Sequence, residues 1–174
     1  QLPAVLPLPD GFAADASPGG PGCLTVGRRD DPARQRQDDQ VVDLRAAGNV
    51  ALFGAPGAGK TTALVTVAVA ALRADERTRI YGIDAASGRL STLLALPATG
   101  DVVPADDVDR TARLLGMLRD LIDAREAGAP PSSPVLLLVD GFGAFRDAYE
   151  HHATDGGVFA SLIEIVRTGR HAGV

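Results

Sequence analysis

Residues 54–61 read Gly54-Ala-Pro-Gly-Ala-Gly-Lys60-Thr61 and fill every fixed position of a phosphate-binding P-loop. The apolar run Asn49-Val-Ala-Leu-Phe53 precedes this segment, and an alanine-rich run over 61–72 follows it. Gly54 is expected to turn the chain sharply out of a strand, and the loop then opens a helix. A helix N-terminus presents N–H groups and partial positive charge, which favour anions. The alternative is a glycine-rich turn between a strand and a helix. The complete motif and its flanks favour a nucleoside triphosphate site.

Each position in the loop has an expected role. Gly57 and Gly59 allow the backbone to close around phosphate groups, so that successive N–H groups point inward. Lys60 is expected to reach the terminal phosphates, Thr61 to place its hydroxyl on a magnesium ion, and Thr62 to hydrogen-bond a more interior phosphate. The predicted nucleotide-binding residues are Gly54, Ala55, Pro56, Gly57, Ala58, Gly59, Lys60, Thr61 and Thr62. The expected ligands are ATP and Mg²⁺.

The composition indicates one α/β domain. The chain has 174 residues, 45% of them hydrophobic, which is enough to bury one such core. The net charge of −5 and the lack of a basic block argue against nucleic acid as a partner. Cys23 is the only cysteine and cannot form an internal disulfide, which fits a reducing cytosol. No apolar run reaches the roughly 20 residues of a membrane span.

Apolar segments of strand and helix type alternate along the chain. Strands are expected at 49–53, 78–83, 101–103 and 135–139, and helices at 61–73, 106–125 and 158–167. This alternation predicts a mostly parallel sheet flanked by helices, and Gly173-Val174 indicates the entrance to a further strand. Residues 1–26 lack a basic start and are interpreted as linker-like, so the predicted domain spans 27–174.

Two aspartates follow predicted strands. Asp140 ends the apolar run 135–139 at the carboxyl edge of the predicted sheet, where ligands bind in this architecture. We interpret it as a Walker B aspartate that holds Mg²⁺ opposite Thr61, and the alternative is the start of an Asp-Gly turn. Asp84 also ends a predicted strand. It is equally consistent with a supporting role near the phosphates and with a simple turn cap.

The residue after Asp140 bears on catalysis. Many hydrolysing P-loop motors carry a second carboxylate there to orient the attacking water, whereas this chain has Gly141. The next acidic side chains are Asp147 and Glu150, and their spacing places neither on the water. The sequence therefore supports nucleotide binding more firmly than hydrolysis, and it identifies no catalytic residue.

Two groups of charged residues are less informative. His151 and His152 are adjacent, and neighbouring side chains seldom converge on one metal ion. Four arginines at 28, 29, 34 and 36 could touch a phosphate or a neighbouring module, but aspartates at 30, 31, 38 and 39 are interleaved with them. That mixture predicts a solvated surface.

Several segments together resemble the FtsK/SpoIIIE ATPases. They are Asp30-Asp-Pro-Ala-Arg-Gln-Arg-Gln37, the P-loop, Ile80-Tyr-Gly-Ile-Asp84 and Val139-Asp-Gly-Phe-Gly-Ala-Phe145. Within that family the chain is most similar to the degenerate later modules of the EccC ATPase of type VII secretion, in which Asp-Gly-Trp-Gly-like sequences replace the acidic Walker B pair. The similarity covers about residues 27–174 and implies a RecA-like P-loop fold that lacks its last strand or strands here.

The resemblance also implies a function. Such modules lie in tandem on the cytosolic side of a membrane-anchored secretion machine, bind ATP and hold it without fast turnover. One of them offers a groove to the C-terminal signal of small helical export substrates. The expected function is thus an ATP-binding module that supports or regulates protein export, and the alternative is an ATP-hydrolysing motor that moves polypeptide or DNA. The implied partners are neighbouring ATPase modules and small helical substrates, and the implied location is the cytoplasm.

Overall fold

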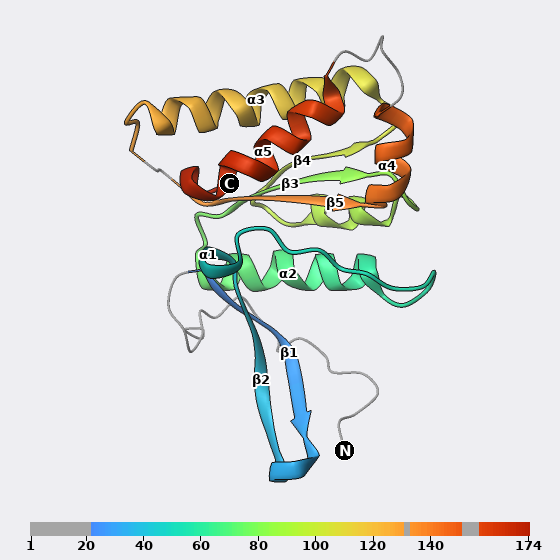
Figure 1. Ribbon diagram of the computed structural model, residues 1–174, viewed down its shortest axis with the longest axis vertical. Helices are drawn as coiled ribbons and strands as arrows, with labels where there is room; N and C mark the ends of the chain where they lie inside the picture. Colours follow the sequence, from blue (N-terminus) through green and yellow to red (C-terminus); the bar gives the residue numbers. More distant parts are fainter. Residues whose placement is uncertain (1–21, 131–132, 151–156) are drawn as a thin grey trace. The chain divides into compact units, whose positions relative to one another are not determined.

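The computed structural model describes residues 22–130, 133–150 and 157–174 of the chain (Figure 1). The chain forms two compact units, Gln1–Glu76 and Arg77–Val174. The segment 1–26 lies mostly outside the described residues, although the first strand begins within it, at Cys23. Residues 151 and 152, the adjacent histidines, also lie outside the described part of the chain.

The first unit contains an antiparallel hairpin that was not predicted from the sequence. Strand β1 (Cys23–Asp31) pairs with β2 (Arg36–Asp43), and the short 3-10 helix η1 (Pro32–Arg34) joins them (Figure 1). The Asp31 carboxylate accepts a hydrogen bond from Arg34 N at 3.3 Å, and Gln35 has a left-handed φ of 50° that reverses the chain. The Asp-Pro pair was the available signal, because both residues favour turns.

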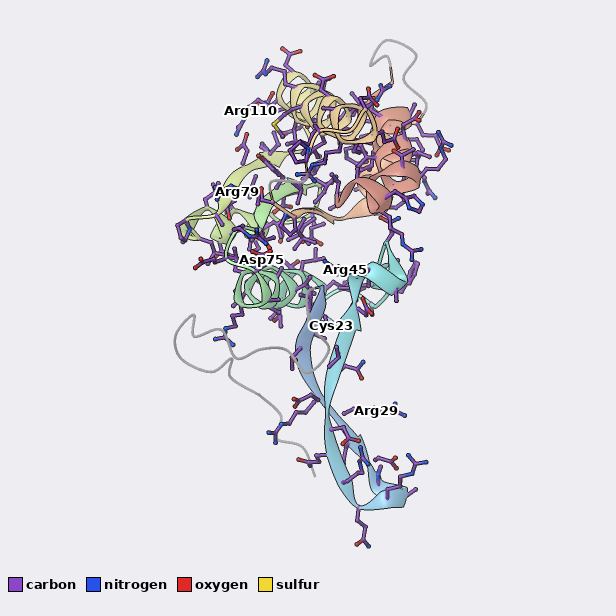
Figure 2. All side chains as sticks on the ribbon, turned by 90° about the vertical axis from the view of Figure 1, so that its left-hand side faces the viewer. Cys23, Arg29, Arg45, Asp75, Arg79 and Arg110 are labelled. Atoms are coloured by element: carbon purple, nitrogen blue, oxygen red, sulfur yellow. The ribbon has the colours of Figure 1, made fainter. Side chains whose placement is uncertain are left out.

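Opposite charges lie directly across the hairpin. The register places Arg28 opposite Asp39, Arg29 opposite Asp38 and Asp31 opposite Arg36, and Figure 2 labels Arg29 on this hairpin. Arg28 Nε lies 3.9 Å from the Asp39 carboxylate. Exposed pairs of this kind contribute only about 0–1 kcal/mol each. The arginines of this segment lie on a mixed, exposed surface, as predicted.

The second half of the first unit contains two helices, and the strand predicted at 49–53 is absent from it. Helix α1 (Leu44–Ala47) is capped by the Asp43 carboxylate, and α2 (Lys60–Ala74) matches the helix expected at 61–73. Residues 49–53 are not a strand, and the Phe53 side chain is 94% exposed. An apolar run becomes a strand only when a neighbouring backbone accepts its hydrogen bonds. Within this unit the described sheet consists of β1 and β2 alone.

The second unit is built on a parallel sheet, as predicted. Its strands are β3 (Arg79–Asp84), β4 (Thr99–Pro104) and β5 (Val135–Asp140). The order is β4-β3-β5, and both pairings are parallel. β3 is therefore central. β5 lies at one edge of the described sheet, although an uninterrupted apolar run of this kind is typical of strands buried on both faces of a parallel sheet. Three of its six residues are only partly buried.

Helices complete the second unit. α3 (Val108–Glu126) and α5 (Val158–Ala172) lie side by side over one face of the sheet (Figure 1), and the 3-10 helix η2 (Arg89–Ala95) contacts β3 and β4. The short helix α4 (Phe142–Tyr149) was not predicted. The apolar residues of α3 that recur at helical spacing face the core. The buried cluster consists of Ile83, Val103, Leu114, Leu115, Leu118, Ile122, Val135, Phe145, Tyr149, Val158, Leu162, Ile165 and Ala172.

Three features fix the ends of the long helices. The Asp107 carboxylate accepts a hydrogen bond from Arg110 N at 3.1 Å and caps the start of α3. Arg125, in the last turn of α3, donates hydrogen bonds to Ala172 O and Ser133 O, both at 2.7 Å. Gly173 ends α5 in the left-handed conformation. None of the helices in the described residues is both long and apolar enough to cross a bilayer.

Candidate nucleotide site

The predicted P-loop is an exposed loop that ends at the start of α2. Residues 51–59 are all exposed, and α2 begins at Lys60. Gly57 and Gly59 have φ angles of 79° and 86°, which side chains with a Cβ rarely adopt. A Cβ at either glycine would meet nothing within 4 Å. The protein's own packing therefore leaves the side of the loop next to these glycines open to a ligand.

The Lys60 ammonium lies inside the curve of this loop. Its Nζ donates hydrogen bonds to Gly54 O at 2.8 Å and to Ala55 O at 2.9 Å. Lys60 is also the only lysine in the 174-residue sequence, since every other basic residue among the 17 Lys and Arg is an arginine. The loop thus holds the chain's one side-chain amine against its own backbone, where a polyanion could replace the carbonyl groups as its partner.

The start of α2 has the features of an anion site. Within the described part of the chain, the backbone N–H groups of Gly57 and Gly59 have no hydrogen-bond acceptor. Thr61 is partly buried and Thr62 is exposed in the first turn of the helix. The helix runs for 15 residues, so its N-terminal partial charge is fully developed. These residues are consecutive in the chain, and their contact with a nucleotide stays a prediction.

The predicted metal ligand Asp140 lies at the carboxyl end of β5. It is 4% exposed and stands in register with Asp84, the last residue of β3, which is 8% exposed. Asp84 uses one carboxylate oxygen to accept a hydrogen bond from Ala86 N at 3.0 Å and the other to accept from Leu90 N at 2.8 Å. Of the two roles that the sequence left open for Asp84, the structure shows the turn cap.

The predicted site residues fall into the two units. The P-loop residues belong to the first unit and Asp140 to the second. Thr61 and Asp140 carry oxygen atoms, which Mg²⁺ prefers as ligands. The described residues contain no group of three or more His, Cys, Asp or Glu residues that could hold a metal ion on its own.

The next two acidic residues after Gly141 both pair with Arg146 of α4. Asp147 accepts a hydrogen bond from Arg146 Nη2 at 2.9 Å, and Glu150 lies 3.5 Å from Arg146 Nε. Both carboxylates belong to exposed residues. Their pairing is consistent with the expectation that neither is placed to activate a water molecule.

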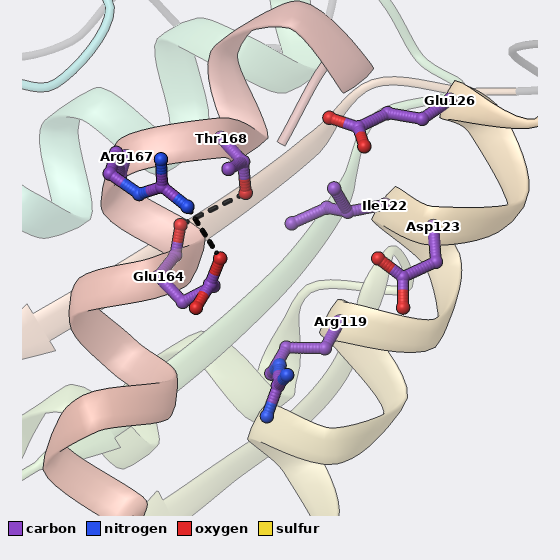
Figure 3. Close-up of a pocket in the computed structure, with 7 residues that line it drawn as sticks. All are labelled: Arg119, Ile122, Asp123, Glu126, Glu164, Arg167 and Thr168. Carbon is purple, nitrogen blue, oxygen red and sulfur yellow. Dashed lines mark hydrogen bonds and ion pairs between the residues drawn. The ribbon is translucent and has the colours of Figure 1, made fainter.

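A separate depression lies between α3 and α5 (Figure 3). It encloses about 160 Å³ and is lined by Arg119, Ile122, Asp123, Glu126, Glu164, Arg167 and Thr168. Arg167 is paired with Glu164 at 2.7 Å, and the remaining acidic groups outnumber the one remaining arginine. Three carboxylates around one depression disfavour a triphosphate, so this feature is not a second candidate for nucleotide binding.

Comparison with known proteins places the sequence in a family. The sequence model of the FtsK/SpoIIIE family matches residues 26–130. The chain belongs to the FtsK/SpoIIIE family. A similar member is the ESX-3 secretion system protein EccC3 of Mycobacterium tuberculosis, which is 31% identical over 166 residues. The alignment covers 86% of this chain but 12% of that protein, so the chain spans about an eighth of the relative's length.

Solved structures of FtsK/SpoIIIE-family ATPases share the fold. The cytoplasmic domain of the type VII secretion ATPase EccC of Thermomonospora curvata matches with a TM-score of 0.74 and 26% identity, over 92% of this chain and 21% of that one. A second structure contains ATPases 2 and 3 of the same EccC in complex with a signal sequence peptide. It matches with a TM-score of 0.72 and 25% identity, over 97% of this chain and 35% of that one. The predicted P-loop ATPase fold and the predicted similarity to EccC ATPases are confirmed.

Proposed function

We propose that this chain is an ATP-binding module of an EccC-like type VII secretion ATPase, which binds Mg-ATP with weak or no hydrolysis and supports or regulates protein export. The observation that carries the proposal is the loop before α2, with two left-handed glycines and the Lys60 ammonium held within 2.8–2.9 Å of Gly54 O and Ala55 O. Gly54 to Thr62 would bind the nucleotide, and Thr61 and Asp140 would be the ligands of Mg²⁺.

Bound nucleotide can have a structural role in such a module. A ligand that binds only the folded state stabilises it by RT ln(1 + [L]/Kd), which is about 4 kcal/mol at 1,000 times Kd. Slow hydrolysis would preserve that stabilisation, and position 141 offers no carboxylate to speed it. The proposed role is therefore to hold Mg-ATP as part of a regulated assembly.

The partners are proposed from the relatives. EccC of T. curvata carries ATPases 2 and 3 in one chain, and one structure of it holds a signal sequence peptide. We infer that this chain adjoins other ATPase modules and acts on small helical export substrates, at the cytoplasmic face of the membrane that the parent machine spans. The net charge of −5 argues against nucleic acid.

The single lysine provides a direct test of nucleotide binding. An amine-acylating reagent has one side-chain target in this sequence, Lys60, and mass spectrometry can measure its rate of modification. Mg-ATP at ten times Kd is expected to slow acylation of Lys60 about tenfold, because only the unbound fraction reacts. Mg-AMP, which lacks the terminal phosphates, serves as the control. Equal acylation rates with and without saturating Mg-ATP, in folded protein, would exclude the proposed site.

A single-turnover hydrolysis assay distinguishes the proposed role, in which the module holds Mg-ATP with weak or no hydrolysis, from the alternative of an active motor. Lys60, Thr61 and Asp140 are also compatible with the alternative, since they are the residues that such motors use. The expected rate is well below about 1 s⁻¹, the usual lower range for enzymes. A faster rate that is lost in Asp140→Ala but kept in Glu150→Ala would establish the motor instead.

A further inference from the structure

Position 141 is crowded by backbone atoms. Gly141 has a φ of 75° and forms the N-cap of α4. A Cβ at this position would lie 2.7 Å from Ala85 O, 2.8 Å from Ala85 C and 3.0 Å from Ala86 N. Contacts this short require something to move, and all three atoms belong to the main chain rather than to a flexible side chain. Two separate features, the left-handed φ and the close approach, therefore favour glycine here.

The crowding backbone is tied down at several points. Ala85 N donates a hydrogen bond to Asp140 O at 2.9 Å, and Ala105 N donates to Asp84 O at 2.9 Å. The Asp84 carboxylate accepts from Ala86 N and Leu90 N, at 3.0 and 2.8 Å. These bonds close the segment 85–90 into a turn that begins directly beside Gly141.

Packing holds the far end of the same turn. The Leu90 side chain is fully buried, and a Cβ at Gly82 would lie 3.0 Å from Leu90 Cδ2, so Leu90 packs directly on the backbone of β3. Asp84 itself is 8% exposed. A buried carboxylate with both oxygens committed to backbone N–H groups makes strong, charge-assisted hydrogen bonds. Asp84 thus anchors the turn at Ala86 on one side and at Leu90 on the other.

We propose that Asp84 is a positioning residue that holds the Ala85–Ala86 backbone over position 141 and so keeps every side chain, including a water-activating carboxylate, out of that position. The turn would therefore exclude the second carboxylate that many hydrolysing P-loop motors carry beside the Walker B aspartate, and no single substitution at 141 can restore it. The consequence of this exclusion for catalysis rests on the proposed function. The exclusion of a side chain from position 141 depends only on residues of the second unit.

A pair of variants separates the destabilisation caused by the close approach of the Ala85–Ala86 backbone from that caused by the left-handed φ angle. Asparagine tolerates the left-handed conformation better than most residues, so Gly→Asn tests crowding with little added strain. Gly88 is the matched control because its φ is 74° and a Cβ there would meet nothing within 4 Å. Both tyrosines of the chain, Tyr81 and Tyr149, lie in the second unit, so the tyrosine band of the near-ultraviolet circular dichroism spectrum reports on that unit during urea unfolding.

The expected result is a large difference between the two glycines. Gly141→Asn is expected to lower the folding equilibrium constant by about a hundredfold or more, and Gly88→Asn by less than about fivefold. In an Asp84→Ala background, the loss caused by Gly141→Asn should shrink at least about tenfold, because the released turn can move aside. In an Asp84→Asn background, which keeps one oxygen acceptor, the loss of folding equilibrium constant caused by Gly141→Asn should lie between the losses measured with Asp84 and with Asp84→Ala.

Equal losses of stability in Gly141→Asn and Gly88→Asn would overturn the positioning role. So would additive effects of Asp84→Ala and Gly141→Asn on the free energy of unfolding. If Gly141→Asn alone does not fold, recovery of folded Asp84→Ala/Gly141→Asn supports the proposal, and failure of that double variant to fold refutes it. The measurement needs no nucleotide. A failure of Mg-ATP to protect Lys60 would therefore remove the proposed function without affecting this result, and the reverse also holds.

Discussion

Lys60→Ala is expected to weaken Mg-ATP binding by about a hundredfold or more. A hydrogen bond to a charged group contributes about 1.5–3 kcal/mol, and 1.4 kcal/mol corresponds to a factor of ten in Kd. The ammonium of Lys60 already faces two carbonyl oxygens of its loop and would exchange both for phosphate oxygens. Calorimetric titration with Mg-ATP measures Kd directly. The thermal stabilisation by Mg-ATP should disappear at the same concentrations.

The same substitution should have little effect on the protein without nucleotide. Both hydrogen bonds of Lys60 are exposed, so the free energy of unfolding is expected to fall by less than about 1 kcal/mol. Arg113→Ala is the matched control, since it also removes one positive charge, from an exposed position on α3. An equal loss of affinity in both variants would mean that net charge, rather than the P-loop, governs binding. Unchanged affinity in Lys60→Ala would exclude the predicted site.

The parts of this structure that were predicted correctly depend on local sequence. Gly57 and Gly59 adopt φ angles of 79° and 86°, a left-handed conformation that glycine enters without steric cost. The helices over 60–74 and 108–126 follow from helical periodicity and from Asp107 as an N-cap. The parallel strands β3, β4 and β5 follow from short apolar runs separated by helices.

The wrong and missing elements are those whose pairing or boundaries the local apolar pattern does not reveal. The apolar run 49–53 has the composition of a strand, but within its unit the described sheet offers it no neighbour. The β1–β2 hairpin escaped detection because cross-strand charges such as Arg28 and Asp39, rather than alternating apolar residues, mark its pairing. Helix α4 escaped because Gly141-Phe-Gly143 reads as a turn, although Phe145 and Tyr149 lie one helical turn apart.

In the candidate site, too, the positions of residues at strand ends could be predicted from the sequence, whereas their contacts could not. The sequence identified Asp84 and Asp140 as strand-terminal carboxylates, and the structure places them in register at one edge of the sheet. The partners of Asp84 could not be read from the sequence, because Leu90 N reaches it only through the path of the turn over 85–90. The reason for glycine at 141 was likewise hidden, since it depends on how close the Ala85 carbonyl approaches.

Phe145→Ala is expected to destabilise the second unit by about 3–5 kcal/mol, the range for removing a fully buried phenylalanine. The Phe145 side chain is fully buried, and its ring centroid lies 4.8 Å from that of Tyr149 and 6.5 Å from that of Phe159. Alanine would leave a cavity where α4, α5 and the sheet meet. Because a domain is stable by only about 5–15 kcal/mol, this loss should lower the urea midpoint sharply.

Phe142 supplies the matched control on the same helix. It is 46% exposed and lies 6.2 Å from the Phe159 ring, so Phe142→Ala removes the same atoms at a cost expected below about 1 kcal/mol. Near-ultraviolet circular dichroism follows both variants through Tyr149, whose ring contacts Phe145. Similar midpoints for the two variants would mean that α4 does not anchor the core of this unit. A large loss in Phe145→Ala alone would establish α4 as the element that fixes the polypeptide just after Asp140, and with it the carboxyl edge of β5.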